Sequence, residues 1–271
     1  MSTYTCRDLT TLEEFAAVVE LERVIWGPGY DEVVPVPILT VSVKRGGILI
    51  GAFEGARMVG FVYSLPGIKH GRPTQWSHML GVLDEYRSAG LGRHLKLLQR
   101  ERALGLQVDL VEWTYDPMQA MNAHLNFAKL GVVAEEYEEN IYGESSSPLH
   151  RGNPTDRFVA EWWIREKRVE ERIGGAVPMA PVLTVEPVNR MRAKGRWMEP
   201  TDLNLSLDAK RLAVEIPIGF TDMLNDAPDL ALEWRAATRK IFTTYFAKGC
   251  KAVDFFLDRS AGRGTYLLVK Q

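Results

Sequence analysis

The sequence contains little cysteine, no long apolar run and almost no excess of charge of either sign. Cys6 and Cys250 are the only cysteines among 271 residues, which is too few for a disulfide framework or a structural zinc site. No apolar run approaches the roughly 18 residues that span a bilayer, and the first residues lack the apolar core of a signal peptide. The 33 basic and 35 acidic side chains nearly cancel, so no general field attracts nucleic acid or an anionic membrane. We therefore expect a cytoplasmic protein without nucleic-acid or membrane partners.

The histidines are too scattered for a metal centre. His70, His94 and His150 have no partner at the spacing of paired metal ligands. We therefore expect no bound metal, and any anion site must be local.

One glycine-containing stretch, from Val82 to Arg93, points to such a local anion site. The apolar run at 78–83 is typical of a buried strand, and leucines at helical spacing follow the glycines. Gly90 and Gly92 therefore lie at a strand-to-helix turn, where a ligand can approach the backbone closely. The first amides of a helix have no intrahelical partners, and the positive end of its dipole favours anions. With Arg87 beside it, the turn suits a pyrophosphate.

Two common phosphate-binding loops do not fit this turn. A Rossmann fingerprint needs a third glycine where Leu95 stands, and a Walker loop needs Gly-Lys-Ser/Thr, which is absent. The spacing Arg87-x-x-Gly90-x-Gly92 instead resembles the acyl-CoA pyrophosphate loop of the GNAT acyltransferase superfamily, including its lead-in of valine, linker residues, an aromatic residue and arginine. For these six residues alone, a glycine-softened helix start with a solvated arginine is the alternative.

The order of elements up to residue 143 also resembles the GNAT fold. The pattern predicts strands at 4–9, 48–53, 58–65, 75–83, 108–114 and 132–142, and helices from Thr11, at 37–44, after the glycine turn and at 118–130. Thr11 and Glu14 form a capping-box pattern, and Gly131 is a natural residue to end the last helix. We expect an α/β domain at residues 1–143, with a GNAT-type mixed central sheet flanked by helices.

The rest of the chain predicts a linker and a C-terminal α/β domain. A serine-rich stretch opens a linker-like segment at 144–156, and the C-terminal domain is expected at 157–271. Its pattern predicts a strand at 157–164, a helix at 230–248 and paired strands at 253–257 and 265–269. This order of strand, helix, strand and strand favours a degenerate second GNAT-like half. An unrelated α/β extension is the alternative.

The resemblance implies which residues bind the co-substrate, either acetyl-CoA or another acyl-CoA such as succinyl-CoA. The backbone of Leu80 and Val82 would hold the pantetheine arm, and Asn122 would line the cleft beside it. A solvated helix face is the alternative use of Asn122. The implied pyrophosphate cradle comprises Arg87, Ser88, Ala89, Gly90, Leu91, Gly92 and Arg93.

Transfer of an acyl group to an amine also needs a base. His78 stands where some GNAT members carry a base histidine, and its ordinary pKa of about 6.5 suits that task. A hydrogen-bonded core histidine is the alternative. Glu112, on the neighbouring predicted strand, is the second candidate, with a solvent-facing carboxylate as its alternative.

The general acid that many relatives use is missing. The helix containing Ala123 and Phe127 resembles a family motif whose tyrosine is Phe127 in this chain, and a phenyl ring cannot donate a proton. Either Tyr115, Tyr137 or Tyr142 takes over, or the thiolate leaves unassisted, because a thiol with a pKa near about 8.5 is a fair leaving group. No Gly-x-Ser-x-Gly or Cys/His nucleophile is evident, so we expect direct transfer rather than a covalent acyl-enzyme.

The resemblance therefore implies an acyl-CoA-dependent N-acyltransferase (EC 2.3.1.-) that moves an acetyl or succinyl group to a small amine, for example a free amino acid. Arg235 and Arg239, with several tryptophans, are expected to enclose this acceptor. The alternatives are a non-catalytic acyl-CoA-binding regulator, an acyltransferase acting on a protein amine, and an interaction module. A homodimer is expected from the family alone.

Overall fold

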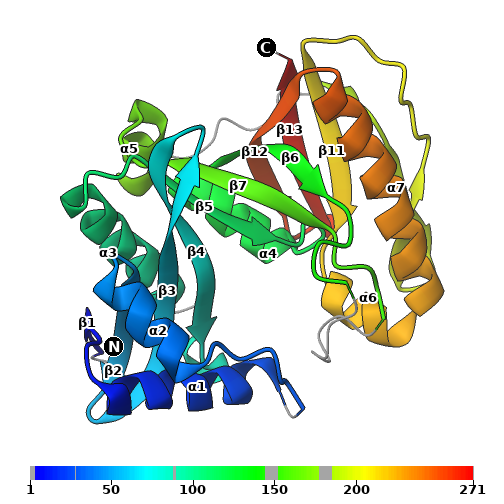
Figure 1. Cartoon of the computed structure of the whole chain (residues 1–271). Coiled ribbons are helices and arrows are strands. Elements are labelled where there is room, and N and C mark those ends of the chain that lie inside the picture. The colour runs from blue at the N-terminus through cyan, green and yellow to red at the C-terminus, as the bar shows by residue number, and fades with distance from the viewer. Residues whose placement is uncertain (1–3, 28, 88–89, 144–151, 177–184, 271) are drawn as a thin grey trace. The chain divides into compact units, whose positions relative to one another are not determined.

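The computed structural model describes residues 4–27, 29–87, 90–143, 152–176 and 185–270 (Figure 1). They form two compact units. The described residues of the first unit lie within Met1–Trp113 and Trp163–Arg165, and those of the second within Thr114–Ser145, His150–Trp162 and Glu166–Gln271. No helix in these ranges is long and apolar enough to cross a membrane.

The first unit is built on a mixed sheet. Its strands, in spatial order, are β1 (Thr5–Asp8), β2 (Ile48–Glu54), β3 (Arg57–Lys69), β4 (Arg72–Val82) and β5 (Leu110–Tyr115). The first four are antiparallel to their neighbours, whereas β5 runs parallel to β4. A parallel pair needs a crossover connection, which a helix provides here. The last two residues of β5 are counted with the second unit.

Among the described residues, three helices and one short turn of 3₁₀-helix accompany this sheet. They are α1 (Leu12–Trp26), α2 (Val36–Lys44), η1 (Asp84–Tyr86) and α3 (Leu91–Gly105). The predicted capping box begins α1. The amide of Glu14 donates to the Thr11 hydroxyl over 3.3 Å, and the amide of Thr11 donates to the Glu14 carboxylate over 3.0 Å.

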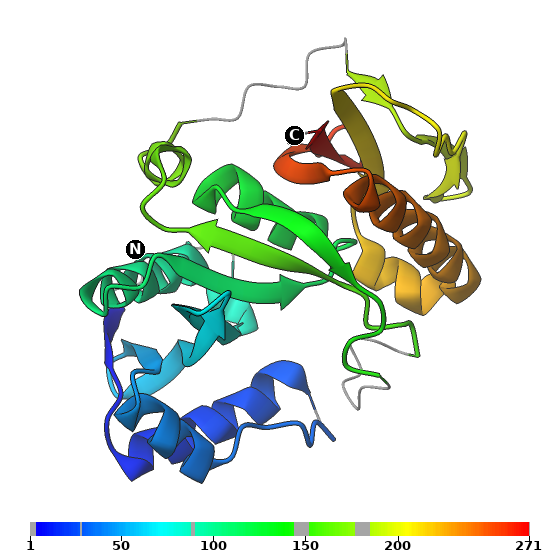
Figure 2. The same cartoon turned by 45° about the horizontal axis from the view of Figure 1, so that its top comes forward.

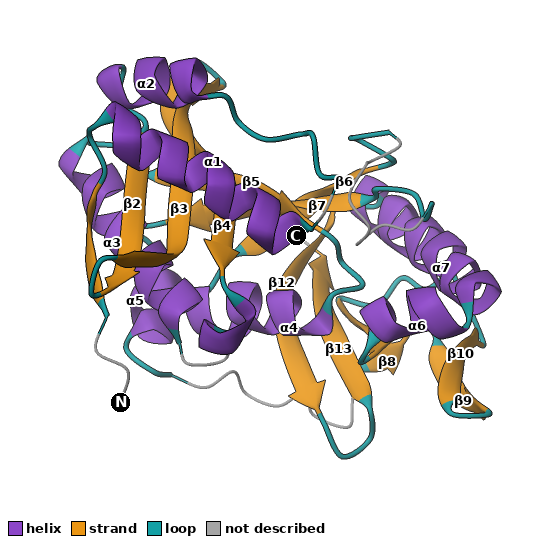
Figure 3. Cartoon of the chain, turned by 90° about the horizontal axis from the view of Figure 1, so that it is seen from below, coloured by secondary structure: helices purple, strands orange, loops and turns teal. Residues whose placement is uncertain are grey.

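The helices α1 and α3 pack on opposite faces of the sheet. A side chain at Gly81 of β4 would meet Trp26 of α1 at 3.3 Å, whereas one at Gly60 of β3 would meet Leu91 of α3 at 3.5 Å. Gly60 pairs with Val82, the neighbour of Gly81, and successive residues of a strand point to opposite faces. Figure 3 shows α1 and α2 lying over β2, β3 and β4.

The second unit is also of the α/β class. Its elements are α4 (Ala120–Ala123), the π-helical η2 (His124–Leu130), β6 (Val133–Glu138), β7 (Arg157–Trp163), α5 (Lys167–Ile173), β8 (Glu186–Pro187), β9 (Arg190–Lys194), β10 (Trp197–Thr201), β11 (Arg211–Pro217), α6 (Phe220–Asp226), α7 (Pro228–Ala247), β12 (Cys250–Asp258) and β13 (Arg263–Lys270).

The sheet of the second unit has the strand order β7-β6-β12-β13-β11-β8, and β9 and β10 form a separate two-stranded sheet. Pairs in the main sheet are antiparallel except for β11 with β8. The long helix α7, orange in Figure 2, packs against β6, β10 and β12. Its predicted end is confirmed, because Gly249 follows it in a left-handed conformation with φ of 80°.

Aromatic rings fill the core of the second unit. The ring of Tyr266 lies 5.6 Å from that of Phe127, 5.5 Å from Phe158 and 5.4 Å from Phe242 between centroids, each at a steep angle. Such edge-to-face pairs add to the stabilisation that burial of the rings provides. Tyr115 joins this core through Phe158, at 5.8 Å.

The predicted order of elements up to β6 is confirmed, including the mixed sheet flanked by helices. The β3–β4 pair extends further than the predicted strands at 58–65 and 75–83, through Pro66, Gly67 and Pro73. In the structure these residues still pair across the two strands, as far as the turn after Lys69. Proline and glycine weaken a strand locally, but two strands can stay paired past them when the residues on either side still pair.

The two compact units divide the chain differently from the predicted domains at 1–143 and 157–271. The strand predicted to open the C-terminal domain, β7, pairs with β6 through Tyr137 with Phe158 and Glu138 with Arg157. It therefore continues the sheet that β6 begins. Most of the predicted linker at 144–156 lies outside the described residues.

One connectivity occurs twice in the second unit. The strand β11 is followed by α6, α7, β12 and β13, and β13 lies between β11 and β12 in the sheet. The end of β5, at Thr114 and Tyr115, is likewise followed by a helix, β6 and β7, in the strand order β5-β7-β6. This recurrence supports our proposal of a degenerate repeat.

Candidate functional site

The strand β4 carries an irregularity beside the predicted base. Its register with β3 shifts between the pairs Tyr63–Met79 and Leu65–Trp76, so Ser77 and His78 lie opposite the single residue Ser64. Bulges of this kind bend a strand and re-aim its side chains, and they are common next to active sites. Sequence reasoning missed the bulge, because it depends on the pairing of two strands.

Beyond the bulge, one edge of β4 is turned away from β3. Leu83 donates its amide to the Val59 carbonyl over 3.0 Å. Because backbone groups alternate sides along an antiparallel pair, those of Leu80 and Val82 point away from β3. The described pairing of β4 with β5 covers Gln75 and Trp76. The Val82 carbonyl accepts from the Arg87 guanidinium over 3.2 Å, so a pantetheine amide would have to compete with Arg87 there. The predicted pantetheine contact of Leu80 and Val82 stays a prediction.

The glycine turn leads directly into α3. Gly90 has a φ of +84°, which other residues rarely adopt, and, apart from its chain neighbours, no atom of the described residues lies within 4 Å of where its side chain would begin. At Gly92 a Cβ atom would meet, among the described atoms outside the backbone of α3, the side chain of Leu80 at an ordinary 3.7 Å. Packing alone therefore does not demand glycine at position 92, and the space is available to a ligand. Ser88 and Ala89, also predicted in this cradle, lie outside the described residues.

The start of α3 offers several anion donors. The first bond of the helix runs from the His94 amide to the Gly90 carbonyl over 3.0 Å, so the amides of Leu91, Gly92 and Arg93 precede the intrahelical ladder. Arg87 lies beside them, half exposed, and forms an ion pair with Asp84 at 2.8 Å. A phosphate would have to compete with Asp84 for this guanidinium.

His78 remains the candidate base. Its side chain is exposed at the bulge, and its ring meets the edge of the Tyr63 ring with 6.1 Å between centroids. Surrounding protein withdraws water from part of the imidazole, which lowers the pKa of His78 below its ordinary value. The imidazole is therefore neutral at pH 7 and able to accept a proton. Its role as the base stays a prediction.

Glu112 is poorly placed to act as a base. It is neither solvent-facing nor free: its side chain is buried, and Lys69 donates to its carboxylate over 2.7 Å. A carboxylate held by a lysine in a buried ion pair is occupied, because the ammonium competes with any substrate proton.

The predicted acid Tyr115 lies in the aromatic core of the second unit. Its hydroxyl is 3.3 Å from that of Tyr266, and burial raises the pKa of Tyr115 well above its ordinary value. Tyr137 is half-buried and donates to Asp156 over 2.7 Å. Both hydroxyls are engaged with protein groups, and the role of either tyrosine as the general acid stays a prediction. Tyr142 is the exposed one, and its hydroxyl lies 2.6 Å from that of Thr114.

Asn122, predicted to line the cleft beside the pantetheine arm, is exposed on α4. Phe127 of η2 is completely buried. Nothing in the described contacts assigns Asn122 to a cleft. Among the residues that the structure describes, no cluster of three or more acidic, histidine or cysteine side chains is suited to a metal.

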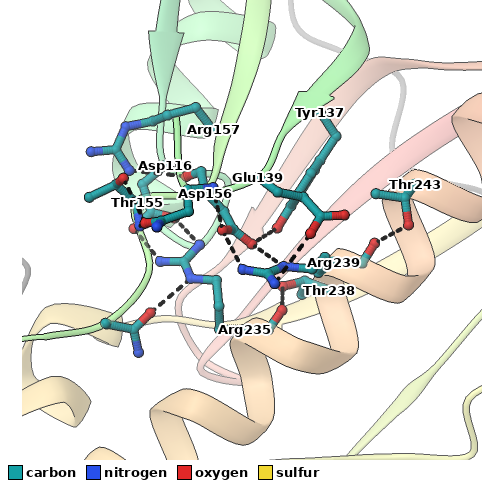
Figure 4. A network of polar contacts seen from close by, with 12 residues as sticks. Asp116, Tyr137, Glu139, Thr155, Asp156, Arg157, Arg235, Thr238, Arg239 and Thr243 are labelled. Carbon is teal, nitrogen blue, oxygen red and sulfur yellow. Dashed lines mark hydrogen bonds and ion pairs between the residues drawn. The ribbon is translucent and has the colours of Figure 1, made fainter. Parts of the chain in front are cut away.

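Arg235 and Arg239, predicted to enclose the acceptor, are engaged in ion pairs within the second unit (Figure 4). Arg235 donates to both carboxylate oxygens of Asp116, over 2.7 and 2.8 Å. Arg239 donates to both oxygens of Asp156, over 2.8 and 2.7 Å, and Tyr137 donates to the same carboxylate. These arginines therefore serve the framework of α7 rather than a free carboxylate of a ligand.

A polar cluster in the first unit was missed by sequence reasoning. Glu22 of α1, Ser42 of α2 and Tyr63 of β3 are buried together on the face of the sheet that α1 covers. A signal was present, because Glu22 follows Val18 and Val19 at the spacing that places it on the apolar side of the helix.

Comparison with known proteins gave matches among solved structures alone, since no family model and no curated protein matches the chain. The acetyltransferase of the GNAT family from Streptococcus pneumoniae matches with a TM-score of 0.48 and 16% identity, over 59% of this chain and 98% of that chain. The ribosomal-protein-S18-alanine N-acetyltransferase from Escherichia coli matches with a TM-score of 0.47 and 15% identity, over 60% and 94%. Salmonella typhimurium yncA, solved with its cofactor acetyl-CoA, matches with a TM-score of 0.47 and 15% identity, over 61% and 96%. Each similarity thus spans nearly all of the other chain and about three fifths of this one.

Proposed function

We propose that this chain is an acyl-CoA-dependent N-acyltransferase that moves an acetyl or succinyl group directly to the amine of a small molecule, such as a free amino acid. One observation carries the proposal. In the first unit, the backbone of Leu80 and Val82 that faces away from β3 is followed, after η1, by the glycine turn at the start of α3. An extended arm with amide groups can add to a strand edge, and a pyrophosphate at its end suits a helix N-terminus.

In the proposed reaction, protein groups bind and orient the acyl-CoA and the acceptor, while bonds form and break at the amine and the thioester. The backbone of Leu80 and Val82 holds the pantetheine arm, and the amides of α3 hold the pyrophosphate. His78 accepts a proton from the ammonium of the acceptor. The nitrogen lone pair then forms a bond to the thioester carbon, the carbon–sulfur bond breaks, and its electron pair leaves on sulfur.

The departing thiolate takes its proton from water in this scheme. Phe127 has no proton to give, and Tyr115 and Tyr137 hold theirs inside the core of the second unit. A thiol with a pKa of about 8.5 leaves adequately as the thiolate. The reaction therefore requires a base but no protein acid.

The test measures release of free thiol from acetyl-CoA and from succinyl-CoA in the presence of pooled L- and D-amino acids, with acyl-CoA binding followed by calorimetry. We expect one donor to release thiol with one pool, and separating that pool identifies the acceptor. A chain that binds neither donor contradicts the proposal.

A non-catalytic acyl-CoA-binding regulator is the second candidate, favoured by the burial of Phe127 where relatives carry an acid. It would bind acyl-CoA and release no thiol with amino acids or with peptides bearing a free amine. Release with peptides alone would instead indicate a protein amine as the acceptor. A cytoplasmic location and a homodimer complete the proposal, and light scattering of the purified chain measures the oligomeric state.

A further inference from the structure

One lysine of the first unit is buried inside the protein. Lys96 of α3 is 3% exposed, and three side chains that contact it, Ser77, Gln99 and Trp113, are 6%, 0% and 7% exposed. Lysine is almost never fully buried unless its nitrogen is paired. An apolar side chain would fill the same space without the cost of withdrawing a polar nitrogen from water. The contacts of Lys96 therefore need an explanation.

The side chain of Lys96 connects its own helix to two strands of the sheet. Its Nζ donates to the Ser77 hydroxyl of β4 over 3.0 Å and to the side-chain oxygen of Gln99, on the same helix, over 2.8 Å. The side-chain nitrogen of Gln99 donates to the same Ser77 oxygen over 3.0 Å. The Lys96 nitrogen also lies 3.5 Å from the centre of the Trp113 ring of β5, within the range of a cation–π contact.

These hydrogen bonds do not depend on the charge of Lys96. Burial lowers the pKa of Lys96 well below its ordinary value. The ammonium has three N–H donors and the neutral amine has two, so either form can donate to Ser77 and Gln99. The lysine therefore holds Ser77 in both protonation states.

The Ser77 contact lies at the bulge that carries His78. Ser77 and His78 together lie opposite the single residue Ser64 of β3. On the side of β5, the described pairing of β4 ends with Trp76 and Glu112, directly before the bulge. Because the extra residue of a bulge disrupts the backbone ladder locally, side-chain contacts have to fix the strand at this point.

The residue opposite the bulge is held by side-chain hydrogen bonds as well. The Ser64 hydroxyl donates to the side-chain oxygen of Gln75 over 2.7 Å, and the side-chain nitrogen of Gln75 donates to the Gly46 carbonyl over 2.8 Å. Both strands of the bulge are therefore fixed by buried polar side chains. A functional side chain keeps a productive orientation when the residues around it are locked in this way.

We propose that Lys96 is a positioning residue: by holding Ser77 it fixes the bulge of β4, and with it the orientation of the His78 imidazole toward the acceptor amine. The inference rests on the proposed acyl transfer, in which His78 is the base. Lys96 acts through Ser77 and takes no part in bond making or proton transfer.

The place of Lys96 on α3 adds a second consequence. This helix begins at the glycine turn, where the pyrophosphate is expected, and Lys96 stands in its second turn. One helix would thus bind the acyl donor at its first residues and hold the strand of the base a turn later. The donor and the base are then set against each other by a single rigid element.

The kinetic test measures kcat and KM for thiol release in the wild type, Lys96→Met and Ser77→Ala. Lys96→Met keeps an unbranched side chain and removes the hydrogen bonds, whereas Ser77→Ala removes the same contact from the strand. We expect each to lower kcat on the order of 100-fold, the effect that a displacement of about 1 Å can have, and to leave KM for acyl-CoA unchanged. Lys44→Met is the matched control, because this lysine is exposed on α2, and it should retain the wild-type kcat.

A spectroscopic test follows His78 directly and needs no substrate. The ring of Tyr63 lies 6.1 Å from that of His78 between centroids, and an aromatic ring shifts the NMR signals of protons beside it. The His78 signal is assigned by its loss in His78→Gln, and spectra are recorded well above the pKa of the imidazole. We expect Lys96→Met and Ser77→Ala to shift this signal and Lys44→Met to leave it in place.

The outcomes separate this inference from the proposed function. A wild type that releases no thiol with any acceptor overturns the acyl transfer and with it the role of Lys96. An active wild type whose Lys96→Met variant keeps its kcat, or loses kcat without a shift of the His78 signal, overturns the positioning role alone. A raised KM with unchanged kcat also contradicts it, since Lys96 would then serve donor binding. If Lys96→Met does not fold, Ser77→Ala decides by the same readouts.

Discussion

At the scale of single residues, Glu22 makes the stability of the first unit depend on pH. Burial raises its pKa to about 7, so between about pH 4.5 and pH 7 the folded chain keeps a proton that the unfolded chain has lost. The free energy of unfolding therefore falls as pH rises through this window. The shift corresponds to about 3 kcal/mol in total. Glu22→Gln cannot ionise, so its free energy of unfolding should exceed that of the wild type at pH 8 and match it near pH 4.

Urea unfolding across this pH range measures the effect. Glu20→Gln, on the exposed side of α1, should retain the wild-type slope. Parallel curves for the wild type and Glu22→Gln would show that Glu22 titrates alike in the folded and unfolded chain, contrary to the buried site described here.

At the scale of elements, a substitution at the start of α3 should affect ligand binding without lowering the stability of the fold. Gly92 has room for a side chain, and an acidic residue in the first turn is favourable to the helix, with a gain of up to about 1 kcal/mol. Gly92→Asp should therefore fold at least as well as the wild type. It should also lose acyl-CoA binding, because its carboxylate would stand where the pyrophosphate is expected. Calorimetry with acetyl-CoA and thermal unfolding measure the two effects.

Gly105→Asp is the matched control, since it places the same charge at the other end of α3. It should retain acyl-CoA binding and lose a little stability through the helix dipole. Undiminished binding by Gly92→Asp would remove the glycine turn from the site.

Elements of this fold were predictable where one residue or one local pattern determines the backbone. Gly90, Gly131 and Gly249 adopt left-handed conformations at the helix ends where the sequence predicts them. The bulge at His78 and the partner of β7 were not predictable, because each depends on a strand distant along the chain. Chemical roles are also hard to predict when they depend on contacts with distant parts of the chain. Apolar periodicity identified the helix containing Glu22 but could not reveal that its buried carboxylate accepts from the amide of Val34, twelve positions further along the chain.

At the scale of the whole chain, ion pairs between distant segments secure the second unit. Asp116 and Arg235 are 119 positions apart, and Asp156 and Arg239 are 83 apart. Burial alone would raise the pKa of Asp116, but the charge and hydrogen bonds of Arg235 outweigh this and hold the pKa below its ordinary value. This stabilisation is present above the ordinary carboxyl pKa of about 3.9 and is lost as pH falls through the lowered one.

Asp116→Asn should destabilise the second unit strongly, because it leaves the buried Arg235 without its counter-charge. Breaking such a buried pair from one side costs about 3–5 kcal/mol. Asp208→Asn makes the same chemical change at an exposed pair with Lys270, where the Asp208 side chain is 81% exposed, and solvent already screens that charge, so little change is expected. Chemical unfolding of the full chain, followed by tryptophan fluorescence at pH 7, compares the two variants. Equal stability for both would mean that the cost of burying Arg235 and Asp116 cancels their attraction, and that the aromatic core around Tyr266 alone determines the stability of this unit.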